Sequence, residues 1–503
     1  MTWRVLLLCL AAGCAAPRSR ARAPRAALPS PVQLVKLQPS TGPGVVVKLV
    51  FRSGSIDDPP GREGLTALAA RLMAEGGTAN VTAERLQELL YPLAAEIDVH
   101  SEKEVTVFEG RAHHDHLDRF LPILLDVVLR PRLDAKDLER LRGDAISDLE
   151  KRLRVADDEA LGKEALEALL FEGHPYGHPV VGTSSGLRAI TMEDVRVHIG
   201  RVFGQRRLTI GIGGAYPPEL PEHLLRMLAT LPEGDVLSRE PPAPAENKTR
   251  VLLIEQENIA TALSLGFAYD LRRGQPGFFP LALAVSALGE HRQFHGRLFV
   301  ELRAKRGLNY GDYAYAEHFA QEGWTRFPRT GTPRRRQHMS LWIRPVEHAN
   351  RLFALRAALF ELDRFAKEGL SAEELDRTRE FLLGYTRLFE QTDSRRLGYA
   401  LDDLFYGTPP HLEALRASLP AIGLESVQAA IRQHVDPRRA RIVIVTKDAA
   451  ALRDALQKGD PSPIKYPTPK AQDVIERDRA IAAFPLGFAP DEIRLVRSEE
   501  LFR

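Results

Sequence analysis

The stretch of sequence that decides the fold is residues 54–71, which read GSIDDPPGREGL and then TALAAR. It directly follows residues 45–53, an apolar run rich in valine that predicts a buried β-strand. The glycines and prolines of residues 54–64 interrupt both strand and helix patterns and predict a turn between two elements. The next element carries alanine at positions 67 and 70 and arginine at position 71. These three positions become important once the rest of the chain is considered.

Segments far apart in the chain repeat one another in the same order. Residues 133–142 (LDAKDLERLR) share five identities with residues 370–379 (LSAEELDRTR), and residues 189–195 (AITMEDV) match residues 421–427 (AIGLESV). A pair of arginines precedes a predicted strand in both halves, at positions 206–207 and 438–439. The offsets are nearly constant, so we predict a tandem duplication. The expected units are residues 31–222 and 249–460, with a proline-containing connector at 223–248 and a C-terminal tail at 461–503.

Each unit mixes strand and helix patterns. Residues 45–53 and 261–269 predict strands, whereas residues 117–128 and 350–367 show the helical apolar period. Ser371 followed by Glu374 predicts a capping box, and Asp134 predicts another helix start. The expected fold class is therefore α+β.

Composition excludes one class of partner. The 503 residues contain 69 basic and 67 acidic side chains, a formal net charge of +2, so the chain lacks the positive field that phosphate-backbone binding requires. Both cysteines, Cys9 and Cys14, lie in the first 14 residues. Any metal on the folded body must therefore be held by nitrogen and oxygen ligands.

The N-terminus predicts export. A short basic start and an apolar run precede Leu-Ala-Ala-Gly-Cys at residues 10–14, which resembles the bacterial lipobox. We expect residues 1–13 to be a lipoprotein signal peptide, Cys14 to be lipidated, and residues 14–30, rich in proline and arginine, to be a tether. The chain would then face the periplasm on a membrane of the bacterial envelope, with the outer membrane weakly favoured. The alternative is an ordinary cleaved signal with an incidental cysteine.

Residues 54–65, together with GHPYGHP at residues 173–179, resemble the pitrilysin/insulinase metallopeptidases. The resemblance implies two tandem homologous α/β-sandwich domains that form half of a clam-shaped chamber. In active members a helix after the first segment carries H-x-x-E-H, with two histidines on zinc and a glutamate as general base. Here those positions hold Ala67, Arg71 and Ala70, and the third-ligand position holds Asp148.

None of the four positions keeps its catalytic residue, so we expect no zinc in this chain and no activity of the chain alone. Alanine offers no donor atom, and a permanent arginine cation repels a dication. We also hypothesise that Arg71 faces Asp148 and that this pair replaces the charge balance of the metal site.

Residues 296–310 resemble the arginine/tyrosine element of the same family, with Arg303 and Tyr310 seven residues apart. The resemblance implies that the two side chains contact a peptide substrate by hydrogen bonding. The alternative is a packing role, in which Arg303 ends a helix and Tyr310 lies in a strand.

Three further groups have simpler explanations. His113, His114 and His116 precede the helical pattern at residue 117 and predict a solvated helix start. His174 and His178 are flanked by Pro and Gly, which predicts loop structure. The arginines at 334–336 are expected in an exposed loop.

The leading functional hypothesis is a non-catalytic subunit of an envelope peptidase. It would bind a peptide or unfolded polypeptide and pair with a homologue that carries the intact zinc motif, or with a second copy of itself. One alternative is a structural or peptide-binding scaffold with no peptidase role. A less favoured alternative is an active peptidase with unorthodox metal ligands.

Overall fold

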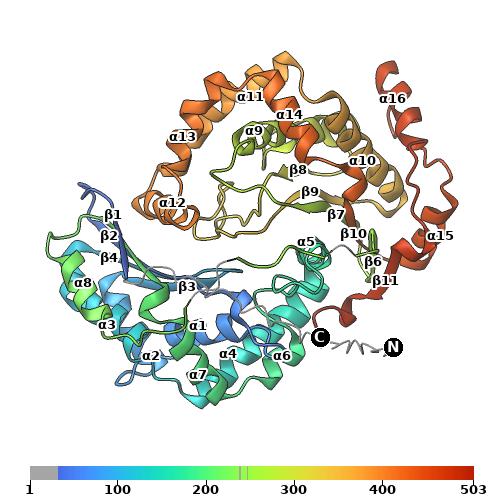
Figure 1. Ribbon diagram of the computed structural model, residues 1–503. Helices are drawn as coiled ribbons and strands as arrows, with labels where there is room; N and C mark the ends of the chain where they lie inside the picture. The colour runs from blue at the N-terminus through green and yellow to red at the C-terminus, as the bar shows by residue number, and fades with distance from the viewer. Residues whose placement is uncertain (1–31, 237–239, 246) are drawn as a thin grey trace, which may run out of the picture.

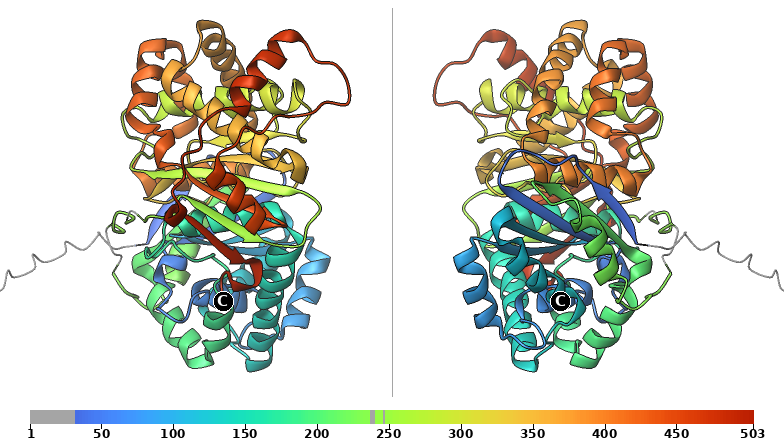
Figure 2. Two further views of the ribbon diagram at one scale, coloured as in Figure 1. Left: turned by 90° about the vertical axis from the view of Figure 1, so that its right-hand side faces the viewer. Right: turned by 90° about the vertical axis from the view of Figure 1, so that its left-hand side faces the viewer.

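The computed structural model describes residues 32–236, 240–245 and 247–503. Cys14, the signal peptide and the tether lie outside this range. Two halves, each made of one sheet with helices on its outer side, face each other through their sheets (Figure 1). Side views show the same arrangement, with helices at the two ends and the strands between them (Figure 2).

The two sheets have the same topology. In each half, five strands lie in the chain order first–fifth–second–fourth–third; the first and fifth are parallel and the other neighbours are antiparallel. The N-terminal sheet consists of β1 (Gln33–Lys36), β2 (Gly44–Phe51), β3 (Glu96–Ser101), β4 (Thr106–His113) and β5 (Leu208–Gly214). The C-terminal sheet contains β6 (Val251–Glu255), β7 (Thr261–Tyr269), β8 (Asp312–Tyr315), β9 (Gln337–Val346) and β10 (Arg441–Thr446). The identical order confirms the duplicated α+β fold.

Helices complete both halves, with one more described helix in the N-terminal half than in α9–α15 of the C-terminal half. The N-terminal half contains α1 (Leu65–Glu75), α2 (Ala83–Leu90), α3 (Leu117–Leu129), α4 (Ala135–Ser147), α5 (Asp158–Leu170), α6 (Ser184–Ala189), α7 (Met192–Val202) and α8 (Leu220–Leu228). The C-terminal half contains α9 (Phe278–Gly289), α10 (Arg351–Glu368), α11 (Ala372–Tyr385), α12 (Asp393–Tyr406), α13 (His411–Ser418), α14 (Leu424–His434) and α15 (Ala449–Lys458). Helix α8 crosses the unit boundary expected at residue 222 and buries Leu224 and Leu228, so the folded N-terminal half continues to the end of this helix.

The repeated sequence motifs make equivalent contacts. Arg142 on α4 donates to the carbonyl of Ile190 at 2.6 Å, and Arg379 on α11 donates to the carbonyl of Ile422 at 2.8 Å. Ser371 caps α11 through the predicted capping box with Glu374. The repeat in the sequence thus marks a repeated tertiary contact between a helix and the start of a later one.

One helix of each half packs against the sheet of the other half. Helix α5 packs on β7 and β10 of the C-terminal sheet, where Leu161 and Leu166 lie in one apolar cluster with Val443 and Val445. Helix α12 packs on β1, β2 and β5 of the N-terminal sheet, with Leu397 and Leu401 against Val46. Because each sheet is covered on its inner face by a helix of the other half, the two halves share their cores.

The C-terminal tail is part of the fold. Helix α16 (Gln472–Ala482) packs on α10, and β11 (Ile493–Arg497) extends the C-terminal sheet by pairing in parallel with β6. Leu501 and Phe502 then contact the apolar cluster around α5. Across the residues that the structure describes, no helix combines the length and hydropathy needed to cross a membrane.

Candidate functional site

Helix α1 carries the positions that would bind zinc in active relatives. Its start is fixed by Asp58, whose carboxylate accepts hydrogen bonds from the backbone amides of Gly64 and Thr66, both at 2.7 Å. These bonds satisfy amides that the first helical turn leaves without partners. Gly64 has a φ of 101° and lies against Gly182, so a side chain at this position would collide with backbone. The turn predicted between strand and helix at residues 54–64 therefore has a specific structure that fixes the start and the direction of α1.

The chemistry of α1 does not fit zinc. Ala70 is fully buried in the apolar core, and Ala67 is half-buried. Arg71 donates to Glu75 at 2.8 Å and lies 4.0 Å from Asp144. Two methyl groups and a guanidinium provide no electron pair for a metal. No catalytic step can be assigned to this helix.

Arg71 forms its ion pairs with Glu75 and Asp144, and Asp148 acts on it only through a longer-range electrostatic interaction. Asp148 begins the π-helix η4 (Asp148–Ala156), and its side chain is half exposed and binds Arg152 at 3.3 Å. Burial alone would lower the pKa of Arg71, but Glu75, Asp144 and Asp148 outweigh burial and raise it. The charge of Arg71 is therefore balanced mainly within its own helix and by α4, one turn before Asp148.

Arg303 and Tyr310 lie at the edge of the C-terminal sheet, before β8. Arg303 belongs to the short π-helix η6 (Phe299–Ala304), and its guanidinium carbon lies 4.7 Å from the ring centre of Phe299. Tyr310 precedes β8 and is 79% exposed, so it has no packing role inside a strand. Among the described residues, neither side chain has a hydrogen bond or ion pair of its own. Both polar groups remain available to a ligand.

The expectation that residues 334–336 form an exposed loop is wrong. Arg334 is 1% exposed and donates to Glu167 of α5 at 3.0 Å and to Glu102 at 3.3 Å. Arg335 binds Glu104, and its backbone amide donates to the same carboxylate at 2.6 Å. Arg334 and Arg335 thus belong to a buried ionic network that joins the two halves, whereas Arg336 pairs with Asp270 at 3.1 Å.

This network borders a cavity of about 290 Å³ between the halves. Glu167, His318 and His338 line it, and each offers a ligand atom within 4.8 Å of the others. Burial lowers the pKa of His338 to about 3, so its imidazole is neutral. Burial would raise the pKa of Glu167, but Arg334 and Lys103 hold it well below its usual range. The sequence did not predict this cluster, because Glu167 lies more than 150 residues before the two histidines and the three share no motif.

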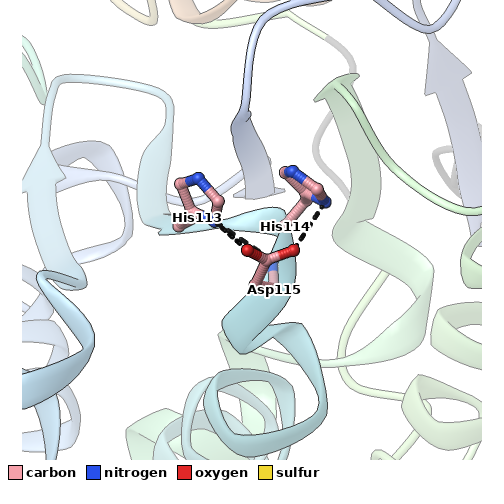
Figure 3. A group of neighbouring side chains, drawn as sticks. All are labelled: His113, His114 and Asp115. Atoms are coloured by element: carbon pink, nitrogen blue, oxygen red, sulfur yellow. Dashed lines mark hydrogen bonds and ion pairs between the residues drawn. The ribbon is translucent and has the colours of Figure 1, made fainter.

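A second group, His113, His114 and Asp115, lies on the surface where β4 ends (Figure 3). The Asp115 carboxylate lies 3.4 Å from Nδ1 of His113 and 3.2 Å from Nδ1 of His114. His113 also accepts a hydrogen bond from the Asp115 amide at 3.2 Å. The arrangement is that of a solvated helix start. His174, in turn, accepts from the Tyr176 amide at 3.0 Å and stabilises its loop.

The fold and site together define a class: a two-domain, pitrilysin-like peptidase homologue whose zinc helix has lost its ligands. Family models agree. Residues 34–184 match the insulinase family (peptidase family M16), and residues 189–382 match the peptidase M16 inactive domain. The chain therefore belongs to the insulinase family, M16.

Known relatives align over about four fifths of the chain. An uncharacterized zinc protease, YmxG, of Bacillus subtilis is 22% identical and aligns over 80% of this chain and 93% of its own length. A non-peptidase homolog, YmxG, of Helicobacter pylori is 21% identical and aligns over 80% of this chain and 88% of its own length. A solved structure from Pseudomonas fluorescens, described as a peptidase M16 inactive domain, has a TM-score of 0.72 at 22% identity and covers 82% of this chain and 94% of its own. One of these two YmxG relatives is named a protease and the other a non-peptidase homolog, although their identities to this chain are nearly the same. The question of catalysis must therefore be argued from the residues at the site.

Proposed function

We propose that this protein is the non-catalytic, peptide-binding subunit of an envelope zinc peptidase, with the zinc supplied by a homologous partner. One observation carries the proposal. The helix that would bind zinc has no donor atoms at its motif positions, whereas the arginine and tyrosine that would meet a substrate keep their polar groups free.

The chemistry of Arg303 and Tyr310 suits an extended peptide. A guanidinium offers several donors in one plane, and a phenol donates or accepts, so both can bind peptide carbonyls. Packing of the Arg303 guanidinium on Phe299 holds it in place, which reduces the entropy lost on binding. The name of the Helicobacter relative, a non-peptidase homolog, is consistent with a role of this kind.

The test is a cleavage assay on a quenched peptide library with three samples. They are the full chain alone, an intact-motif homologue encoded nearby alone, and the two proteins together. We expect cleavage that requires the homologue and rises when this chain is added. Arg303→Ala or Tyr310→Phe should remove the increase. Tyr91→Phe is a matched control, because Tyr91 is 87% exposed and Tyr310 79%. Arg438→Ala is a control for the loss of an arginine at an exposed position elsewhere. An unchanged rate with and without this chain would favour the scaffold alternative.

We also propose that Cys14 carries the lipid that anchors the protein to the envelope. Multiple acyl chains anchor a protein stably where a single chain does not. Labelling cells with a palmitate analogue should mark the full chain and should leave the Cys14→Ala variant unlabelled and in the soluble fraction. A variant that keeps the label would disprove the assignment.

A further inference from the structure

We infer that Glu167, His318 and His338 form a transition-metal site between the two halves, separate from the vacated zinc helix. The three residues come from α5, from the segment after β8 and from β9, so an ion here would connect both halves. Two imidazole nitrogens and a carboxylate oxygen form a donor set that suits zinc or another first-row dication. The site is independent of the peptide-binding proposal.

Unsatisfied nitrogen atoms support this assignment. His338 is 6% exposed, and its Nδ1 is buried without a hydrogen-bond partner. Nε2 of His318 is likewise buried without a hydrogen bond and lies 3.7 Å from the Glu102 carboxylate, while its Nδ1 lies 3.5 Å from Glu167. A buried polar group without a partner costs about 1–3 kcal/mol. Two such imidazoles facing one carboxylate, beside a cavity of about 290 Å³, leave both the need and the space for an ion.

The charges around the cavity also admit a cation. Lys103 and Arg334 bind Glu167 at 3.1 and 3.0 Å, and Arg334 also binds Glu102. These two cations are balanced by the two carboxylates, and they take the place of the outer partners that orient metal ligands. Lys163, which also lines the cavity, is paired with Glu159 at 2.5 Å. Glu164 lines the same cavity three residues before Glu167, on the same face of α5, and within the described chain it has no hydrogen bond or ion pair. Burial and the neighbouring Glu167 raise the pKa of Glu164. Its carboxyl group is a candidate fourth ligand, which would bind an ion by giving up its proton.

The experiment is metal binding by the full chain after chelator treatment. Zinc is added, unbound ion is removed by gel filtration, and the metal content is measured; cobalt(II) then reports the ligand geometry through its visible absorption. We expect about one ion per chain. His318→Ala, in a half-buried segment outside the strands, and His338→Gln should each weaken binding at least about tenfold.

The matched control is His113→Ala combined with His114→Ala, which removes the surface histidines of Figure 3 and should leave binding unchanged. Zinc should also raise the melting temperature of the wild type and of this control, but not of His318→Ala. Absence of stoichiometric metal in the wild type would overturn the assignment. The assignment would also be overturned if zinc binding survives in both His318→Ala and His338→Gln. It would likewise be overturned if only the combined His113→Ala and His114→Ala variant loses zinc binding.

Discussion

At the scale of single residues, the chemistry of a side chain depends both on its own atoms and on the partners that the fold brings to it. Ala67, Ala70 and Arg71 exclude zinc by their atoms alone, whatever their surroundings. The three arginines at 334–336 carry the composition of a solvated loop, yet Arg334 is buried. Its partners Glu167 and Glu102 lie 167 and 232 residues away in the chain, and no local pattern encodes such a pairing.

Asp312 gives a residue-scale prediction about pH. It lies two residues after Tyr310, is 1% exposed, and accepts one hydrogen bond from Asn309 at 2.6 Å while its Oδ2 has no partner. Burial raises its pKa from 3.8 to about 8, so the folded state holds a proton that the unfolded state releases between those values. This group therefore makes the free energy of unfolding fall as pH rises, by about 1.4 kcal/mol per pH unit.

Asp312→Asn mimics the protonated side chain and should remove that contribution. Urea denaturation of both proteins between pH 4 and pH 8 is the measurement. We expect the variant to gain stability relative to the wild type as pH rises across this range. A constant difference between the two would show that Asp312 is ionised in the fold.

At the scale of elements, periodicity and capping predicted well. The helices expected at residues 117–128 and 350–367 correspond to α3 and α10, and the strands expected at 45–53 and 261–269 correspond to β2 and β7. The exchange of α5 and α12 between halves was not predictable. An amphipathic helix shows that it buries a face, but its sequence does not say against which sheet.

The duplication predicts matched energetics for matched contacts. Arg142→Ala and Arg379→Ala each remove a hydrogen bond from one helix to the carbonyl before another, at 2.6 and 2.8 Å. Each should lower the free energy of unfolding by about 1–2 kcal/mol, and the double variant should show their sum, because the sites lie in different halves. Chemical denaturation measures all three. A strongly non-additive double variant would mean that the two contacts are not independent copies.

At the scale of the whole molecule, the structure shows two halves locked by shared cores and by a buried ionic network. Tail residues 461–503 could not be placed from sequence, because strand β11 is short and pairs with β6, more than 230 residues earlier. The exchanged helices α5 and α12 make the halves mutually dependent. The side chains between the two sheets therefore pack against residues of both halves.

Arg334→Ala tests whether the buried ionic network holds the two halves together. Removing Arg334 from the buried network leaves Glu102 without its arginine and Glu167 with Lys103 as its remaining ion-pair cation, which costs about 3–5 kcal/mol. We expect a loss of that size in urea denaturation and faster proteolysis within residues 316–336. The exposed Arg438→Ala should change stability by less than about 1 kcal/mol. A loss as small for Arg334→Ala would show that the network does not hold the halves together.

The proposed function requires that this chain bind peptide without cutting it. The most direct measurement is the anisotropy of a labelled, extended peptide titrated with the full chain alone in zinc-containing buffer, with the peptide's mass read at the end. We predict saturable binding, an intact peptide, and roughly tenfold weaker binding by Arg303→Ala, since a charge-assisted hydrogen bond contributes about 1.5–3 kcal/mol. Cleavage of the peptide by the chain alone, or no binding at all, would contradict the claim.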